Sequence, residues 1–259
     1  MDFGLRGKVG IVGGASMGIG YGIARELAAE GASLALTARR HPALSEAAAR
    51  IRAETGATVL TIPADYRRAE DCARVVETTV NQLGGVDILI NNDGAPPLGE
   101  LASLDDTSWA KAVEQNLMYV VRMTRAVVPH MKARGGGGIL SITAISAIQP
   151  IPGFGLSVAT WGGVIGFAKT LSLEVARDNI NVNTICPGYI ETQRLEKVFA
   201  AGGQDPSIMR GKLEAEVPMG RIGRVEDIAG LAALLVSPRG RYITGTAIQV
   251  DGGLLRGVR

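Results

Sequence analysis

Short apolar runs of strand length alternate with stretches of helical periodicity along the whole chain of 259 residues. The runs are rich in Val, Ile and Leu without in–out alternation, which is typical of strands buried on both faces of a parallel sheet. This alternation predicts one doubly wound α/β domain over residues 1–259. We expect strands at residues 8–13, 33–38, 57–62, 86–91, 138–143, 180–186 and 247–251. We expect helices at residues 19–30, 44–55, 69–83, 106–134, 157–177 and 225–236.

Residues 191–220 break this alternation. A long segment without periodicity inside a compact domain is often functional, and we expect a surface excursion that forms a lid over a substrate site. Its side chains, among them Gln193, Arg194, Lys197, Phe199 and Met209, indicate only a mixed polar and apolar lid.

Charge and cysteine content exclude several classes of protein. The net charge is +2, from 27 basic and 25 acidic side chains, which is not typical of an electrostatic nucleic-acid binder. Two cysteines, Cys72 and Cys186, cannot form a disulfide framework, so we expect a reducing compartment. No apolar run approaches the ~18 residues of a membrane span. We therefore expect a cytoplasmic protein without membrane or nucleic-acid partners.

The first expected strand leads into a glycine-rich turn, Gly13-Gly14-Ala15-Ser16-Met17-Gly18-Ile19-Gly20, and then into a helix. Gly14 permits the turn, Gly18 removes a Cβ where a pyrophosphate would approach the backbone, and Gly20 permits close helix–strand packing. The helix N-terminus supplies free N–H groups and a positive dipole. The strand–turn–helix context predicts a dinucleotide site, whereas the same residues without it would be only a tight turn.

The end of the second expected strand indicates which dinucleotide binds. A site for NAD usually carries an acid about 20 residues beyond the glycine turn, which accepts a hydrogen bond from the ribose 2′-OH. This chain has Thr37-Ala38-Arg39-Arg40 instead. A guanidinium there would pair with a 2′-phosphate, so NADP(H) is favoured over NAD(H). The alternative is a solvated arginine pair on a loop.

Together with further motifs, the sequence resembles the short-chain dehydrogenase/reductase family over essentially its whole length. Asn91-Asn92-Asp93-Gly94 resembles the family's Asn-Asn-Ala-Gly, and Pro187-Gly188-Tyr189-Ile190-Glu191-Thr192 is similar to its Pro-Gly loop. Thr244-Gly245 through Val250-Asp251-Gly252-Gly253 resembles its C-terminal strand signature. The resemblance implies a Rossmann-like domain with about seven parallel strands, and a homo-tetramer or homodimer built on two long helices.

The resemblance also implies roles for individual residues. Asp65 matches an acid that touches adenine, Thr192 and its neighbours match the loop that holds the nicotinamide amide, and Asn116 matches the active-site Asn. The residues expected to bind the cofactor are Gly14, Ser16, Met17, Gly18, Ile19, Gly20, Arg39, Arg40, Asp65, Asn91, Gly94, Pro187, Gly188, Ile190 and Thr192. No metal site is expected, because no cluster of Cys, His and Asp has metal-ligand spacing.

The family's catalytic residues are missing from this chain. In the family a Tyr and a Lys lie four apart on the helix after strand five, hence on one helical face, and a Ser on that strand positions the substrate. In the matching register these positions hold Ser157, Trp161 and Ala144. No Tyr-x3-Lys occurs anywhere in the chain, so the loss does not depend on the register. General acid–base assistance is commonly worth ~10²–10⁴ in rate, so ordinary carbonyl reduction should be impaired.

Several nearby residues could substitute for the missing acid. Asp93 replaces a small residue beside the cofactor loop, although a turn cap is the alternative. Tyr189 lies near the expected substrate as an acid or as a hydrophobic wall. Thr143 and Ser146 flank Ala144 and could hydrogen-bond a substrate, or cap a strand and a turn.

Three functions are compatible with these residues. The first is an NADP(H)-dependent oxidoreductase acting on a small or medium hydrophobic carbonyl or enone, with a non-standard proton donor. The second is a non-redox enzyme, such as an isomerase, lyase or cyclase, on the same scaffold. The third is a catalytically silent nucleotide-binding or partner subunit. The cofactor loops favour the first and third, whereas Trp161 favours the second and third.

Overall fold

The computed structural model describes every residue except 1, 95, 194, 197–204 and 258–259. The chain forms a seven-stranded parallel sheet with the strand order β3-β2-β1-β4-β5-β6-β7. The strands are β1 (Val9–Val12), β2 (Ser33–Ala38), β3 (Val59–Pro63), β4 (Ile88–Asn91), β5 (Gly137–Ile142), β6 (Ile180–Pro187) and β7 (Ala247–Val250). The predicted Rossmann-like α/β architecture is confirmed.

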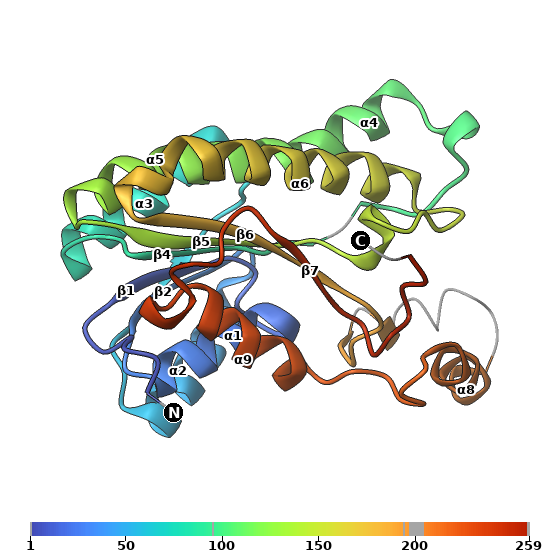
Figure 1. Cartoon of the computed structure of the whole chain (residues 1–259), viewed down its shortest axis with the longest axis horizontal. Coiled ribbons are helices and arrows are strands. Elements are labelled where there is room, and N and C mark those ends of the chain that lie inside the picture. Colours follow the sequence, from blue (N-terminus) through green and yellow to red (C-terminus); the bar gives the residue numbers. More distant parts are fainter. Residues whose placement is uncertain (1, 95, 194, 197–204, 258–259) are drawn as a thin grey trace.

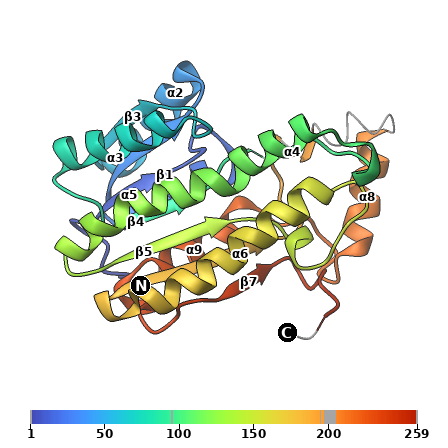
Figure 2. The ribbon, with the colours of Figure 1, turned by 90° about the horizontal axis from the view of Figure 1, so that it is seen from above.

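Helices cover both faces of the sheet (Figures 1 and 2). The helices are α1 (Gly18–Ala29), α2 (His41–Thr55), α3 (Ala69–Leu83), α4 (Asp106–Val113), α5 (Tyr119–Ala133), α6 (Gly155–Val175), α8 (Pro206–Glu216) and α9 (Val225–Leu235). In Figure 1, α1, α2 and α9 lie below the sheet, and α3, α5 and α6 lie above it. Shorter helical segments are η1 (Leu101–Ser103), η2 (Glu114–Met118), η3 (Ile145–Ala147), η4 (Ala176–Asp178) and η5 (Pro238–Gly240).

Each face of the sheet carries its own apolar core. Ile11 and Val12, successive residues of β1, are both fully buried, but they belong to different clusters. Successive side chains of a strand point to opposite faces, so a strand covered on both sides must be apolar at every position. This explains why the strands appear in the sequence as unbroken apolar runs.

Two expected segments differ from the structure. The helix predicted over residues 106–134 is divided by η2, a single π-helical segment between α4 and α5. The predicted excursion over residues 191–220 contains the regular helix α8, which begins at Pro206 after the capping residue Asp205. Part of that excursion, including the predicted lid residues Arg194, Lys197 and Phe199, lies outside the described residues.

Within the described ranges, the segment Gly155–Asp178, which contains α6, is long and apolar enough to cross a membrane by length and composition. Core helices of soluble proteins pass the same test, and α6 packs next to β6 in one apolar cluster that includes Val164, Ala168 and Val175. Of the most apolar window, 33% is buried. The sequence alone led us to expect no apolar run that reaches a span, whereas this helix has the length and mean composition of one.

Candidate functional site

The glycine-rich turn lies where β1 ends and α1 begins. Gly14 and Gly18 have positive φ angles of 55° and 60°, a conformation that L side chains rarely adopt. A Cβ at Gly20 would lie 2.5 Å from the Gly14 carbonyl oxygen, so only glycine permits this close approach. The structure thus requires glycine at all three predicted positions.

The N-terminus of α1 is left without a side-chain cap. Met17 occupies the N-cap position in an extended conformation, and its side chain is 39% exposed. Ser16 and Ile19, on either side, are partly buried. Uncapped N–H groups in the first turn of a helix, next to glycines without side chains, form a site suited to a phosphate.

The loop after β4 fixes this turn in place. The Asn92 side-chain amide donates to the Gly13 carbonyl oxygen over 3.1 Å. Asn91 is buried, and its amide lies within 3.4 Å of the Ser141 hydroxyl on β5. Its Oδ1 atom has no hydrogen-bond partner among the described residues.

Arg39 and Arg40 follow β2, and both side chains are exposed. No hydrogen bond or ion pair engages either guanidinium within the part of the chain that the structure describes. A Cβ built at Gly94 would lie 4.0 Å from Arg39 Nη2, so this guanidinium lies beside the loop that follows β4. Arg39 is therefore placed to receive an anion at the edge of the site.

The carboxylate of Asp65, after β3, already pairs with a neighbouring guanidinium. Arg67 Nε donates to Asp65 Oδ1 over 2.8 Å, and Arg67 Nη2 lies close to Oδ2. The hydrogen bond from Arg67 lowers the pKa of Asp65 below its ordinary value, although burial opposes this. Asp65 is at the predicted adenine end, but its carboxylate oxygens are shared with Arg67.

Asp93 belongs to the same end of the site. Burial raises the pKa of its carboxyl group, whereas the Gly94 backbone N–H and Arg39 act in the opposite direction. The other charges that influence it are Asp65 and Arg67. The structure thus groups Asp93 with the residues predicted to bind the adenosine half of a dinucleotide.

The segment after β6 closes on the glycine turn. Pro187 is the last residue of β6, and the Gly188 N–H donates to the Val250 carbonyl oxygen of β7 over 3.0 Å. Ile190 is buried and forms an isolated bridge with Gly223. A Cβ built at Gly18 would lie 3.5 Å from Thr192 Cγ2. Two segments about 170 residues apart in the sequence (192 − 18 = 174) therefore meet at the predicted phosphate site.

Asn116 is held by the π-helical segment η2. Segments of this kind frequently occur at functional sites. The Asn116 side chain is 1% exposed, and its Nδ2 donates to Thr160 Oγ1 on α6 over 2.9 Å. Its Oδ1 has no hydrogen-bond partner among the described residues.

Ser157 lies on α6, one turn before Trp161. The Ser157 side chain is 1% exposed, and its hydroxyl has no hydrogen-bond partner within the described chain. Trp161 is half-buried and packs against the apolar cluster on the α3–α5–α6 face, which also includes Val164 and Ala168. The indole therefore contributes to the core of this face.

Ala144 and its neighbours form the link between β5 and η3. Ala144 is the extended residue that precedes η3. The Thr143 hydroxyl donates to the Ile185 carbonyl oxygen over 3.2 Å and lies 3.3 Å from Cys186 Sγ, so it is engaged within the sheet. The buried Ser146 hydroxyl has no partner among the described residues.

Tyr189 is poorly placed to act as an acid. Its hydroxyl donates to Glu216 Oε2 on α8 over 3.0 Å. Burial, followed by the Glu216 carboxylate, raises the pKa of Tyr189 to about 12, and a higher pKa makes the phenol a weaker proton donor at neutral pH.

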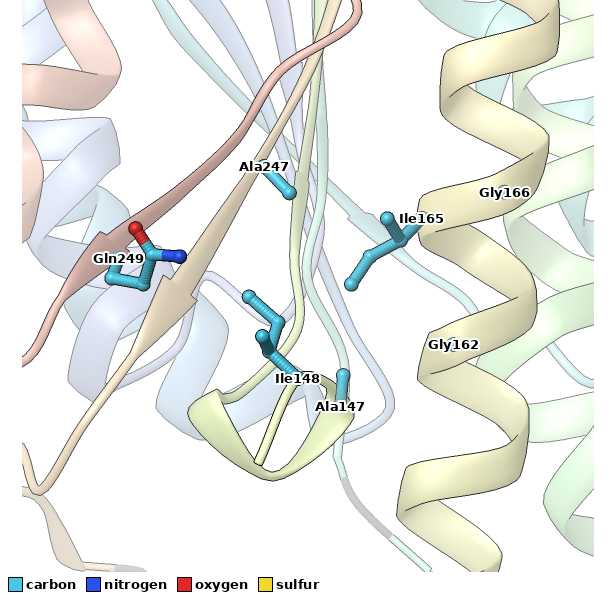
Figure 3. A pocket seen from close by; sticks show the side chains of 7 residues that line it. All are labelled: Ala147, Ile148, Gly162, Ile165, Gly166, Ala247 and Gln249. Carbon is cyan, nitrogen blue, oxygen red and sulfur yellow. The ribbon is translucent and has the colours of Figure 1, made fainter. Parts of the chain in front are cut away.

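An apolar pocket of about 500 Å³ lies between η3, α6 and β7. Figure 3 shows the side chains of Ile148 and Ile165 entering the space between α6 and β7, with the Gln249 amide on the β7 side and no side chain at Gly162. A second pocket of about 390 Å³ includes Tyr189. Both pockets contain Gln249, and neither is lined by Ser157 or Asn116.

Sequence reasoning missed two features of the site. Tyr66 and Tyr119 stack with ring centroids 5.5 Å apart and planes inclined by 6°, and the Tyr66 hydroxyl is hydrogen-bonded to Thr37. The second feature is η2, because one extra residue in a helical turn leaves the apolar pattern almost unchanged. Among the described residues, no group of three or more His, Cys, Asp or Glu side chains could hold a metal ion.

Comparison with known proteins gives a consistent result. A family model described as enoyl-(acyl carrier protein) reductase matches residues 14–255. Dehydrogenase/reductase SDR family member 4 of Oryctolagus cuniculus is 35% identical over 96% of this chain and 94% of its own. Nodulation protein G of Rhizobium sp. (strain N33) is 36% identical, over 97% of this chain and 98% of its own. L-sorbose reductase from Gluconobacter frateurii, solved with NADPH and L-sorbose, is 36% identical over the whole of both chains, with a TM-score of 0.96.

Proposed function

Because this chain belongs to the short-chain dehydrogenase/reductase family, we propose that it binds NADP(H) and reduces a small or medium hydrophobic carbonyl or enone without the Tyr and Lys pair. The observation that carries the proposal is the phosphate turn with its free Arg39, combined with Ser157 at the position of the missing acid. The protein would then be a divergent member with a degenerate catalytic centre.

Three features of the chain fit a dinucleotide. Side chains at Gly14, Gly18 and Gly20 are excluded by conformation or by contact, and the N-terminus of α1 is uncapped. Arg39 follows β2, and no carboxylate of the described residues pairs with it, which suits the 2′-phosphate of NADP(H). The similar L-sorbose reductase was solved with NADPH, which supports the same choice of cofactor here.

The bound nicotinamide would supply a hydride. The remaining step is a proton for the substrate oxygen or carbon, and the residues of this chain offer little assistance. Among the described residues no group hydrogen-bonds to the Ser157 hydroxyl, and Trp161 places an indole where the family has an ammonium group. The proton would then come from solvent or from the substrate, and the turnover rate should fall by ~10²–10⁴ relative to an assisted reaction.

The test is restoration of the missing pair. The double variant Ser157→Tyr with Trp161→Lys is compared with the native protein for NADPH consumption, using a panel of hydrophobic ketones, aldehydes and enones. Slow turnover by the native protein, increased in the double variant, supports the proposal. If neither protein binds NADPH in a calorimetric titration, the proposal is wrong.

A silent nucleotide-binding subunit is the second candidate, and the packing of Trp161 favours it. The Trp161 indole packs in the apolar cluster, so this position on α6 offers no cation to the nicotinamide ribose. Tight NADPH binding, without turnover in the native protein but with turnover in the double variant, would select this candidate.

Three further expectations belong to the same proposal: a homo-tetramer or homodimer built on α5 and α6, residues 191–220 as a substrate lid, and a cytoplasmic location. The described contacts that support the lid join α8 to the segment after β6. They are the Tyr189–Glu216 hydrogen bond and the Arg210–Glu191 ion pair of 2.7 Å. Gel filtration with light scattering would test the assembly.

A further inference from the structure

Four charged side chains that follow the ends of β2, β3 and β4 influence one another electrostatically at the predicted adenosine end of the site. Arg39 follows β2, Asp65 and Arg67 follow β3, and Asp93 follows β4. Two cations and two carboxylates give this cluster no net charge. Arg67 already pairs with Asp65 through their own hydrogen bonds. Arg39 is the cation of this group without a described ion-pair partner, and Asp93 is the carboxylate on the loop beside it.

The Arg39 guanidinium lies beside the loop that carries Asp93. It is next to Gly94, the residue after Asp93, and its charge favours the ionised form of the Asp93 carboxyl group. Asn92, the residue before Asp93, is tied to Gly13 of the phosphate turn. A phosphate group held by Arg39 would therefore lie close to a partly buried carboxylate on a fixed loop.

We propose that Asp93 takes up a proton when the 2′-phosphate of NADP(H) binds, so that the preference for NADP(H) over NAD(H) is strongest in acid. This inference rests on the proposed binding of NADP(H). Once Arg39 pairs with the phosphate, its charge no longer compensates Asp93, and the phosphate adds further negative charge. Both changes favour the neutral carboxyl group. NAD(H), which lacks the 2′-phosphate, makes neither change.

The other titratable groups around Asp93 are not expected to take up a proton when the 2′-phosphate binds. Asp65 is held ionised by Arg67, which lowers its pKa. Tyr66 and Tyr119 are buried, and burial raises the pKa of both phenols, so they stay neutral at physiological pH. The charged or titratable groups that face Asp93 are thus Arg39, Asp65, Arg67, Tyr66 and Tyr119.

Titration of Asp93 and titration of the phosphate change the NADPH affinity with pH in opposite directions. The second pKa of a phosphate monoester is about 6, so the ligand gains charge as the pH rises and should then bind Arg39 more tightly. Proton uptake by Asp93 has the opposite sign, because a higher pH makes the proton scarcer and weakens NADPH binding. The two contributions can be separated, since Asp93→Asn keeps the first and removes the second.

The experiment is calorimetric titration of the native protein and of Asp93→Asn with NADPH and NADH between pH 5.5 and 8.5. Each titration is repeated in buffers of low and high ionisation enthalpy, which counts the protons taken up. At high pH we expect Asp93→Asn to bind NADPH more tightly than the native protein. The difference should be about tenfold for each unit by which NADPH binding raises the pKa of Asp93. In acid the two affinities should converge. The native protein alone should take up a proton with NADPH.

Controls address net charge and folding. Glu70→Gln removes one negative charge from an exposed pair with Arg68 and should leave the pH profile of NADPH binding unchanged. Asp93→Ser, a smaller side chain, repeats the test if Asp93→Asn melts at a markedly lower temperature than the native protein.

Different results separate the two proposals. Equal pH profiles and equal proton counts in the native protein and Asp93→Asn, with NADPH bound by both, would overturn the role of Asp93 and leave the proposed function intact. NADPH binding by the variant alone would support that role, with Asp93 as the barrier. If neither the native protein nor any variant bound either nucleotide, the proposed function and this inference would both be wrong.

Discussion

Buried polar groups have hydrogen-bond partners at the amino ends of the strands and often lack described partners at the carboxyl ends. At the end of the sheet where the strands begin, Asp87 is 2% exposed, and both of its carboxylate oxygens accept hydrogen bonds. It accepts hydrogen bonds from the Val9 N–H at 2.9 Å, from Lys8 Nζ at 3.3 Å and from two nitrogens of Arg134 at 2.9 Å. Toward the carboxyl ends of the strands, side-chain atoms of Asn91, Asn116, Ser146 and Ser157 are buried without described partners.

This difference indicates where the fold is stabilised and where it is held ready for a ligand. A buried polar atom without a partner costs about 1–3 kcal/mol, and such atoms are rare in native proteins. Ligands of parallel α/β sheets bind outside the carboxyl ends of the strands. Four of the seven side-chain atoms that are buried without a described partner lie toward that end, on Asn91, Asn116, Ser146 and Ser157, and the other three are on Tyr21, Thr124 and Thr184. We expect the four to complete their hydrogen bonds with substrate, cofactor or water.

The largest expected effect is at the amino ends of the strands. Asp87→Ala leaves Arg134, Lys8 and the Val9 N–H without their acceptor, and we expect the free energy of unfolding to fall by about 3 kcal/mol. Urea denaturation of the purified protein measures this loss. Glu70→Ala, which breaks an exposed pair with Arg68, should leave the free energy of unfolding nearly unchanged. Equal losses in the two variants would contradict the assigned role of Asp87.

The next prediction concerns the cofactor and Arg39. Arg39→Ala removes a charge-assisted contact to the 2′-phosphate, which is commonly worth about 1.5–3 kcal/mol, or roughly tenfold to a hundredfold in affinity. NADPH binding should weaken by that factor, while NADH binding stays the same, as measured by nucleotide fluorescence. Arg177→Ala is the matched control, because Arg177 is also exposed and lies on η4 just before β6, at the opposite end of the strands. Equal losses for both nucleotides would indicate a general effect on the site.

A pair of substitutions on α6 tests the carboxyl ends of the strands directly. Thr160→Val removes the acceptor of the Asn116 amide and should reduce the free energy of unfolding by about 1–2 kcal/mol. Ser157→Ala removes a hydroxyl that has no described partner, so stability should stay the same or rise by up to about 1 kcal/mol. Both residues are buried on one helix, so the pair controls for burial. Loss of stability in Ser157→Ala would indicate an internal water bound there.

Apolar patterning predicted the sheet well, because strands covered on both faces must be continuously apolar. The strand Ser33–Ala38 and the helix Ala69–Leu83 have the predicted bounds. The same logic fails for η2, whose extra residue per turn barely changes the pattern. It fails again for α8, a helix with few apolar side chains, although Asp205-Pro206 is a recognisable capping signal.

The candidate site could be predicted at the level of backbone positions. Glycine at residues 14, 18 and 20 follows from sterics, which act locally and can be recognised in a motif. The direction of Trp161 and the capture of Asp65 by Arg67 depend on side chains brought together by the fold. Which polar atoms remain unsatisfied depends on the whole assembly of strand ends, and no local pattern encodes it.

The smallest expected effect concerns Tyr189, a polar group at the carboxyl ends of the strands that does have a partner. Tyr189→Phe removes the hydrogen bond to Glu216 and should lower the free energy of unfolding by about 0.5–1 kcal/mol at pH 8, because Glu216 is exposed. The pKa of Tyr189 rises from 10.0 to about 12 on folding. The contribution of the phenol is therefore complete below pH 10 and is lost as the pH rises toward 12, since the unfolded chain releases the proton first.

Urea midpoints of the native protein and Tyr189→Phe should accordingly differ at pH 8 and converge between pH 10 and 12. A difference that persisted at the highest pH would mean that packing of the ring edge, and not the hydrogen bond to α8, accounts for it. Slower NADPH turnover in Tyr189→Phe at pH 8, with unchanged NADPH affinity, would restore this phenol as a candidate acid. Unchanged turnover would leave the substrate or solvent as the source of the proton at the end of the sheet where the Ser157 hydroxyl has no described partner.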